Sequence, residues 1–123
     1  MQLDLDRNIG PTSINAYSEL GVQIAGRWYT GHLLLTPGRL LTDWPAVPVT
    51  ELEHRHLAIL SSENPEVLIL GTGRRIQFPP RRLFADLAAA GIGLEVMDTK
   101  AACRTFNILL SEDRAVVALL YIE

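Results

Sequence analysis

The sequence predicts an α/β fold, a three-layer domain with a central mixed, largely parallel β-sheet, helices on its faces and further antiparallel strands at the N-terminus. Two patterns carry this prediction. From residue 50 onward, segments with helical spacing alternate with short apolar segments in the order helix, strand, helix, strand, helix, strand. Those short segments are apolar at consecutive positions, as at 67–70, which is typical of parallel strands that are buried on both faces.

The first third of the chain favours strands. Segments 14–17, 22–25 and 28–36 are rich in β-branched and aromatic residues, and glycines separate them. Segment 39–44 has the character of another short strand, which Pro45 brings to an end. These strands are expected to form the antiparallel part of the fold.

The helix expected after residue 50 begins with a capping box. The Thr50 hydroxyl can accept a hydrogen bond from the amide of Glu53, and the Glu53 carboxylate can accept one from the amide of Thr50. Asn64 and Pro65 end this helix, and strand 67–70 follows. The residues that recur at helical spacing on its buried face are Leu52, His56, Ile59 and Leu60.

Two further helices are expected in the second half. Pro80 suits the first turn of one, where a missing amide costs no hydrogen bond, and Gly91 can supply its left-handed C-terminal cap. Asp98 or Thr99 can cap the other, which follows strand 94–97 and leads through a turn to the last strand, 115–121. The residues expected on the two buried faces are Leu83, Phe84, Leu87 and Ala88, and then Ala102, Phe106, Leu109 and Leu110.

The composition is that of a single domain, residues 1–123, with 48% apolar and 20% charged residues. Cys103 is the single cysteine, which excludes an intramolecular disulfide and a cysteine-based metal site. His54 and His56 are two residues apart and cannot share a metal from one face of a helix, so no metal or cofactor is expected. The net charge of −3 argues against nucleic acid as a partner and against broad, charge-driven membrane binding.

The N-terminus lacks the basic and apolar regions of a secretory signal. The longest apolar run, 115–122, is far shorter than the roughly 20 residues that cross a membrane as a helix. Together with the lone cysteine, these features predict a cytoplasmic protein that is not embedded in a membrane.

The first candidate site is the loop that begins with Gly71, Thr72 and Gly73. In open α/β sheets ligands bind beyond the carboxyl ends of strands, and glycines there let the backbone approach a phosphate. The third glycine of a dinucleotide-binding fingerprint is absent, because Ile76 stands in its place, and there is no P-loop lysine. The alternative interpretation is a turn that merely requires glycine.

The next candidate is a basic segment, since residues 71–82 carry four positive charges and no negative one. Arg74 and Arg75 follow the glycines, whereas Arg81 and Arg82 lie in the first turn of a helix, where the helix dipole disfavours cations. An anionic ligand or an acidic partner would relieve this repulsion. The alternative is a solvated basic face that pairs with carboxylates from elsewhere.

Segment 97–114 places polar residues among core positions. They either fix the third helix against the Gly71–Gly73 loop or form the polar wall of a cleft, and both interpretations stay open. The polar residues are Thr99, Arg104, Asn107, Glu112 and Arg114. Cys103 lies near the start of the same helix and could act as a nucleophile, but no histidine is placed as its base, which favours a buried, structural cysteine.

Many of these residues also form a family pattern. It comprises Gly71-Thr72-Gly73 after an aliphatic strand, the stretch 91–109, Glu112-Asp113-Arg114 and an aliphatic last strand. In this pattern the sequence resembles the Mth-like family of unknown function, most clearly over residues 67–120. The resemblance implies a three-layer domain with a mixed sheet, and it brings no assigned enzyme activity or catalytic residue.

Relatives in that family include a mitochondrial respiratory complex I assembly factor and an adipogenesis-associated protein. The resemblance therefore implies a non-enzymatic, protein-binding module that assists assembly of a respiratory or other membrane complex. The alternative is a protein that binds a small molecule or anion. Its cleft would be formed by Gly71, Thr72, Gly73, Arg74, Arg75, Thr99, Arg104 and Asn107, with Glu112 and Arg114 in a structural polar network.

Overall fold

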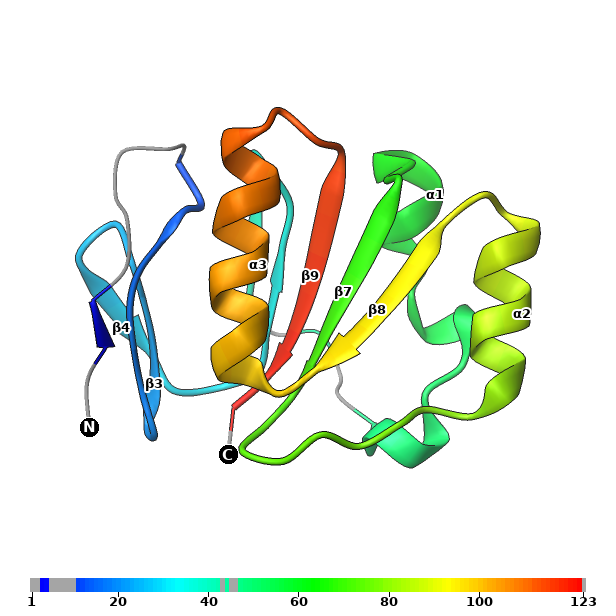
Figure 1. The fold of residues 1–123 in the computed structure, drawn as a ribbon, viewed down its shortest axis with the longest axis horizontal. Helices are drawn as coiled ribbons and strands as arrows, with labels where there is room; N and C mark the ends of the chain where they lie inside the picture. Colours follow the sequence, from blue (N-terminus) through cyan, green and yellow to red (C-terminus); the bar gives the residue numbers. More distant parts are fainter. Residues whose placement is uncertain (1–2, 5–10, 43, 45–46, 123) are drawn as a thin grey trace.

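A computed structural model describes residues 3–4, 11–42, 44 and 47–122. Among these residues, five strands form a central sheet in the order β6-β5-β9-β7-β8 (Figure 1). β7 pairs in parallel with β8 and β9, whereas β5 pairs antiparallel with β9 and β6. This confirms the predicted mixed sheet. The strands are β5 Leu33–Leu35, β6 Leu40–Leu41, β7 Val67–Thr72, β8 Gly93–Met97 and β9 Val116–Tyr121.

A smaller antiparallel sheet is built from the N-terminal strands, which confirms the predicted antiparallel portion. Its strands, in order, are β1 Leu3–Asp4, β2 Ile14–Ser18, β3 Gly21–Ile24 and β4 Arg27–Tyr29. The prediction of one strand over 28–36 is wrong, because exposed residues at 30 and 31 carry the chain from β4 in the small sheet to β5 in the central sheet. The predicted strand 39–44 is also shorter, with only Leu40–Leu41 in the sheet; residue 43 lies outside the described residues.

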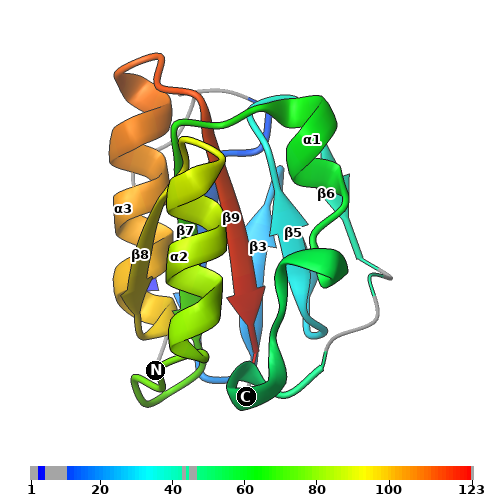
Figure 2. The same cartoon turned by 90° about the vertical axis from the view of Figure 1, so that its right-hand side faces the viewer.

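Helices cover both faces of the central sheet, as predicted. Helix α3, Thr99–Ser111, packs on one face together with the small sheet. Helices α1, Ile59–Glu63, and α2, Arg81–Ala89, pack on the other, and Figure 2 shows α3 and α1 on opposite sides of the strands.

Strand β9 is buried on both faces and contributes to two apolar clusters. Val116, Ala118 and Leu120 pack with α3, whereas the residues between them pack with α1 and α2. Fully burying a side chain as large as valine or leucine stabilises the fold by about 1.5–3 kcal/mol. This strand therefore links the two halves of the core.

The ends of the two longer helices agree with the sequence in most respects. The Asp98 carboxylate caps α3 and accepts a hydrogen bond of 2.8 Å from the amide of Ala101. Pro80 immediately precedes α2, and Gly91 has the left-handed conformation, with φ +79°. The predicted buried face of α2 is wrong for Phe84 and Ala88, which are exposed.

The single helix predicted from Thr50 is also wrong. The chain instead forms two 3-10 turns, η1 Val49–Glu51 and η2 His54–His56, before α1. The capping box lies one turn later than predicted, because the Glu53 amide donates to Nδ1 of His56. Leu57 is buried and His56 is not, so the contacts with the core do not follow one helical face.

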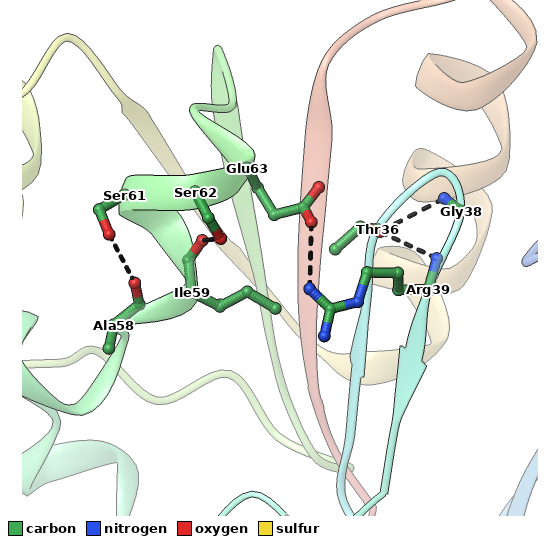
Figure 3. Close-up of polar contacts among 8 residues, drawn as sticks. All are labelled: Thr36, Gly38, Arg39, Ala58, Ile59, Ser61, Ser62 and Glu63. Atoms are coloured by element: carbon green, nitrogen blue, oxygen red, sulfur yellow. Dashed lines mark hydrogen bonds and ion pairs between the residues drawn. The ribbon is translucent and has the colours of Figure 1, made fainter.

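Side chains in α1 also compete with helical hydrogen bonding (Figure 3). The hydroxyls of Ser61 and Ser62 donate to the carbonyls of Ala58 and Ile59, three residues earlier. Glu63 reaches the turn after β5, where its carboxylate lies 3.6 Å from the guanidinium of Arg39. This partly exposed ion pair links α1 to the strand pair β5–β6.

We expect Gly71→Ala to lower the free energy of unfolding by about 1–3 kcal/mol, because the added methyl group overpacks the core. A Cβ at this position would lie 2.9 Å from Cβ of Ala102 and 3.1 Å from Cα of Thr99. Urea denaturation measures the change. Gly31→Ala is the control, since a Cβ there meets no atom within 4 Å and should leave stability nearly unchanged; equal stability of the two variants would contradict the close approach.

Candidate functional site

The loop after β7 is held by its own side chains. The Thr72 hydroxyl donates to the carbonyl of Arg75 at 2.7 Å and accepts a hydrogen bond from the amide of Gln77 at 3.0 Å. Gly73 adopts the left-handed region, with φ +96°, where a residue with a side chain would be strained. The loop therefore has a fixed shape as it leaves the sheet.

Thr99 ties this loop to the rest of the molecule. Its hydroxyl accepts a hydrogen bond from the Gly73 amide at 2.8 Å and donates to the carbonyl of Tyr121 at 2.6 Å. The Thr99 amide donates to the carbonyl of Gly73 at 2.9 Å. Because the backbone amide of Gly73 is already paired inside the protein, it cannot also cradle a phosphate.

The arginines that follow are exposed. Arg74, Arg75 and Arg81 make no ion pair with any described residue, whereas Arg82 lies 3.5 Å from the carboxylate of Asp86. A shallow hollow of about 260 Å³ is lined by Thr72, Arg74, Arg75 and Gln77. The Thr72 hydroxyl is used within the loop, so the two guanidinium groups are the charged groups that this hollow offers to an anion.

Among the described residues, neither Asn107 nor Arg104 forms a hydrogen bond or ion pair with this loop. The Asn107 side chain is buried, accepts a hydrogen bond from the Ile14 amide and donates one to the Ile14 carbonyl, both at 2.8 Å. It thus pairs with β2 as a neighbouring strand would and holds the small sheet against α3. Arg104 lies exposed on α3 and has no ion pair in the described part of the chain.

Arg114 and Glu112 lie at the opposite end of β7 from the loop. The Arg114 guanidinium is 2.9 Å from the carboxylate of Glu66, which precedes β7, and 3.9 Å from that of Glu112. All three side chains are about half exposed to solvent, so these ion pairs contribute at most about 1 kcal/mol.

Cys103 has no access to solvent, and burial raises the pKa of its thiol to about 12. The neutral thiol is a poor nucleophile. Cys103 packs in the apolar cluster between α3 and the sheets, together with Phe106 and Ala118.

An aromatic group at the end of β9 is not among the site residues predicted from the sequence. The Tyr121 hydroxyl donates to the carbonyl of Val47 at 2.7 Å, and its ring lies 5.0 Å from His32 and 5.8 Å from Trp44. Burial raises the pKa of Tyr121 to about 12. The signal was a tyrosine within an otherwise aliphatic strand. A hollow of about 280 Å³ lies here, lined by His32, Val47, Pro48, Val49, Thr72, Gln77 and Tyr121.

Within the described residues, no group of histidine, cysteine, aspartate and glutamate side chains could hold a metal ion. Over the same residues, no helix has the length and apolar character needed to cross a membrane.

Residues 14–121 match a family model described as a protein of unknown function, DUF498/DUF598. The chain belongs to the DUF498/DUF598 family. This confirms the family resemblance found in the sequence, because a solved structure from Bordetella pertussis described as a Mth938-like domain aligns with a TM-score of 0.77. It is 26% identical and covers 99% of this chain and 92% of that one.

Two relatives of this chain carry names that concern a membrane or an assembly role. NADH dehydrogenase (ubiquinone) 1 alpha subcomplex assembly factor 3 of Danio rerio is 35% identical over 111 residues, which are 89% of this chain and 63% of that protein. A 13 kDa major membrane protein of Francisella tularensis is 32% identical over 68 residues, 55% of each chain. The chain therefore spans less than two-thirds of the length of either relative.

A crystal structure of a Bordetella parapertussis protein has the same fold. It aligns with a TM-score of 0.81 at 30% identity and covers 93% of this chain and 98% of that one. The three-layer mixed α/β architecture is thus shared between this DUF498/DUF598 chain and its solved neighbours.

We expect Asn107→Ala to lower the free energy of unfolding by about 2–4 kcal/mol, since it leaves the buried amide and carbonyl of Ile14 without a partner. Urea denaturation measures the loss, and hydrogen exchange should show faster exchange at the Ile14 amide. Arg104→Ala is the matched control on the same helix and should change stability by no more than about 0.5 kcal/mol. Similar losses in both variants would contradict the docking role of Asn107.

We expect Cys103 to react with a thiol reagent at neutral pH roughly a thousandfold more slowly in the folded protein than in denaturant. The side chain is inaccessible, and its pKa of about 12 keeps the thiol protonated at all pH values well below 12. A reagent that releases a coloured thiolate on reaction makes the rate measurable by absorbance. Cys103 is the single cysteine, so the absorbance change reports this residue alone. Fast labelling of the folded protein would overturn the structural role.

Proposed function

We propose that this protein is a cytoplasmic, protein-binding module that assists assembly of a respiratory or other membrane complex. The observation that carries the proposal is its similarity to the Danio rerio assembly factor, which extends over 89% of the chain at 35% identity. A second observation supports the proposal: the groups that could bind or attack a small ligand form hydrogen bonds or pack inside the protein. The Gly73 amide, the Asn107 amide group and the Cys103 thiol are all turned inward.

A deletion strain of the source organism tests this proposal. Without the protein, native gels of detergent-extracted membranes should show less of one assembled complex and more of its partial assemblies, and the wild-type gene should restore the pattern. Affinity purification of the tagged protein should recover subunits of that same complex. Unchanged complexes together with no recovered membrane-complex subunit would overturn the proposal.

A small anion is the alternative, and one observation favours it. The hollow beside Thr72 is bordered by Arg74 and Arg75, neither of which has an ion pair with a described residue. Because the Gly73 amide is used internally, an anion here would depend on the guanidinium groups alone. A thermal-shift series with inorganic phosphate, nucleotides and phosphorylated metabolites tests it; the lack of any rise in Tm would remove this alternative.

A further inference from the structure

The loop after β7 and the start of α2 expose three large apolar side chains. Ile76 is 50% exposed, Phe78 62% and Phe84 36%. They lie within nine consecutive residues: Ile76 and Phe78 belong to the loop that runs along the lower edge of the molecule to α2 in Figure 1, and Phe84 belongs to α2 itself. Exposed apolar side chains that lie together, rather than singly, mark contact sites, and these three share one short segment of the chain.

The loop is ordered by its own hydrogen bonds. Its apolar side chains are therefore exposed on a backbone of defined shape. The Thr72 hydroxyl bonds to both Arg75 and Gln77, and Gly73 pairs with Thr99 through its amide and its carbonyl. A partner would therefore meet apolar groups that are already in place. Such preorganisation lowers the entropy lost on binding.

Arginines are interspersed with these apolar residues along the same segment. Arg74, Arg75 and Arg81 are exposed and make no ion pair with any described residue. Aromatic residues and arginine are the types enriched at the centres of protein interfaces. Arginine also binds carboxylates through two parallel hydrogen bonds, and the hollow lined by Arg74, Arg75 and Gln77 offers room for such a group.

We propose that Arg74, Arg75, Ile76, Phe78, Arg81 and Phe84 form a docking surface for an acidic, apolar segment of a partner protein. The inference rests on the proposed function and names the surface that performs it. Carboxylates of the partner pair with the arginines, while its apolar side chains cover Ile76, Phe78 and Phe84. The other large apolar residues with comparable exposure in the described part of the chain lie in other segments; they are Leu20, Trp28 and Ile108.

An anionic membrane has a related chemistry, but the overall charge disfavours it. A membrane is an extended negative surface that acts on the whole molecule, whose net charge is −3. A protein segment of limited size experiences mainly the local charges, since fields decay over about 8 Å at physiological ionic strength. The local excess of arginine therefore favours a protein segment.

Site-specific photocrosslinking in cells of the source organism tests the surface. Phe78→p-benzoylphenylalanine keeps an aromatic side chain at the exposed position and should crosslink to a segment rich in aspartate and glutamate. Ile108→p-benzoylphenylalanine is the matched control, because Ile108 is 56% exposed on α3 but lies outside the surface. The crosslink should occur at position 78 and not at position 108.

Two surface variants then separate charge from apolar contact. One variant reverses the charges and the other removes the apolar groups: Arg74→Glu/Arg75→Glu/Arg81→Glu and Ile76→Ser/Phe78→Ser. In affinity purification of the tagged protein, each variant should recover roughly tenfold less of the partner identified by crosslinking. Arg104→Glu/Ile108→Ser changes an exposed arginine and an exposed apolar residue on α3 and should capture it as the wild type does. Urea unfolding midpoints close to that of the wild type establish that the surface variants are folded.

The results of these experiments distinguish failure of the docking surface from failure of the proposed function. If membrane-complex subunits are recovered equally by all variants, the proposed function stands and this surface is wrong. A crosslink to a segment without acidic residues, or no crosslink at position 78, also overturns it. Co-sedimentation with phosphatidylglycerol vesicles that the arginine variant abolishes, without a protein crosslink, would assign the surface to a membrane instead.

Discussion

The hydroxyl of Thr99 joins the carboxyl ends of three neighbouring parallel strands. Thr99 begins the helix after β8, Gly73 follows β7, and Tyr121 ends β9. The hydroxyl accepts a hydrogen bond from the Gly73 amide and donates one to the Tyr121 carbonyl, so a single buried side chain from the segment after β8 pairs backbone groups of the other two segments. Leaving either backbone group unpaired in the interior would cost about 1–3 kcal/mol. This junction requires glycine at position 71, because Cα of Thr99 lies 3.1 Å from where a Cβ would stand.

The same junction limits ligand binding at this edge of the sheet. In open α/β folds ligands bind beyond the carboxyl ends of the parallel strands, where free amides and glycines meet them. Here the Gly73 amide and the Thr72 hydroxyl are used to hold the loop, and Thr99 closes the strand ends. What remains available lies outside the junction, on the exposed arginines and apolar side chains that the loop carries outward.

Local sequence patterns predicted the parts of the fold that depend on local physics. Strands β7 and β9 are apolar at consecutive positions because both of their faces are buried, and Asp98 caps the helix that follows it. One failure involves distant partners. Segment 28–36 has strand-forming residues on both sides of Gly31, and a single glycine does not indicate that the two halves belong to different sheets.

The candidate site was predictable to the same extent. The glycines at 71 and 73 and Thr99 could be selected from their positions after strands, but the hydrogen bond between Gly73 and Thr99 spans 26 residues. Asn107 was recognised as a polar residue that needs a partner, and that partner is 93 residues away. The side chain of Asn107 is a primary amide that can both donate and accept hydrogen bonds. It can therefore pair with a strand backbone as readily as with a ligand in a cleft.

The starts of α2 and α3 show why the basic stretch calls for an explanation beyond stability. Helix α3 begins with an aspartate whose carboxylate accepts a backbone hydrogen bond, and this suits the positive end of the helix dipole. Helix α2 has no side-chain cap and no acidic residue in its first turn, which instead carries Arg81 and Arg82. Asp86 pairs with Arg82 and leaves Arg81 without a described partner. A fold that caps one helix well and places two arginines, one of them without a described ion-pair partner, at the start of another retains a local destabilisation, which negative groups supplied from outside the chain would offset.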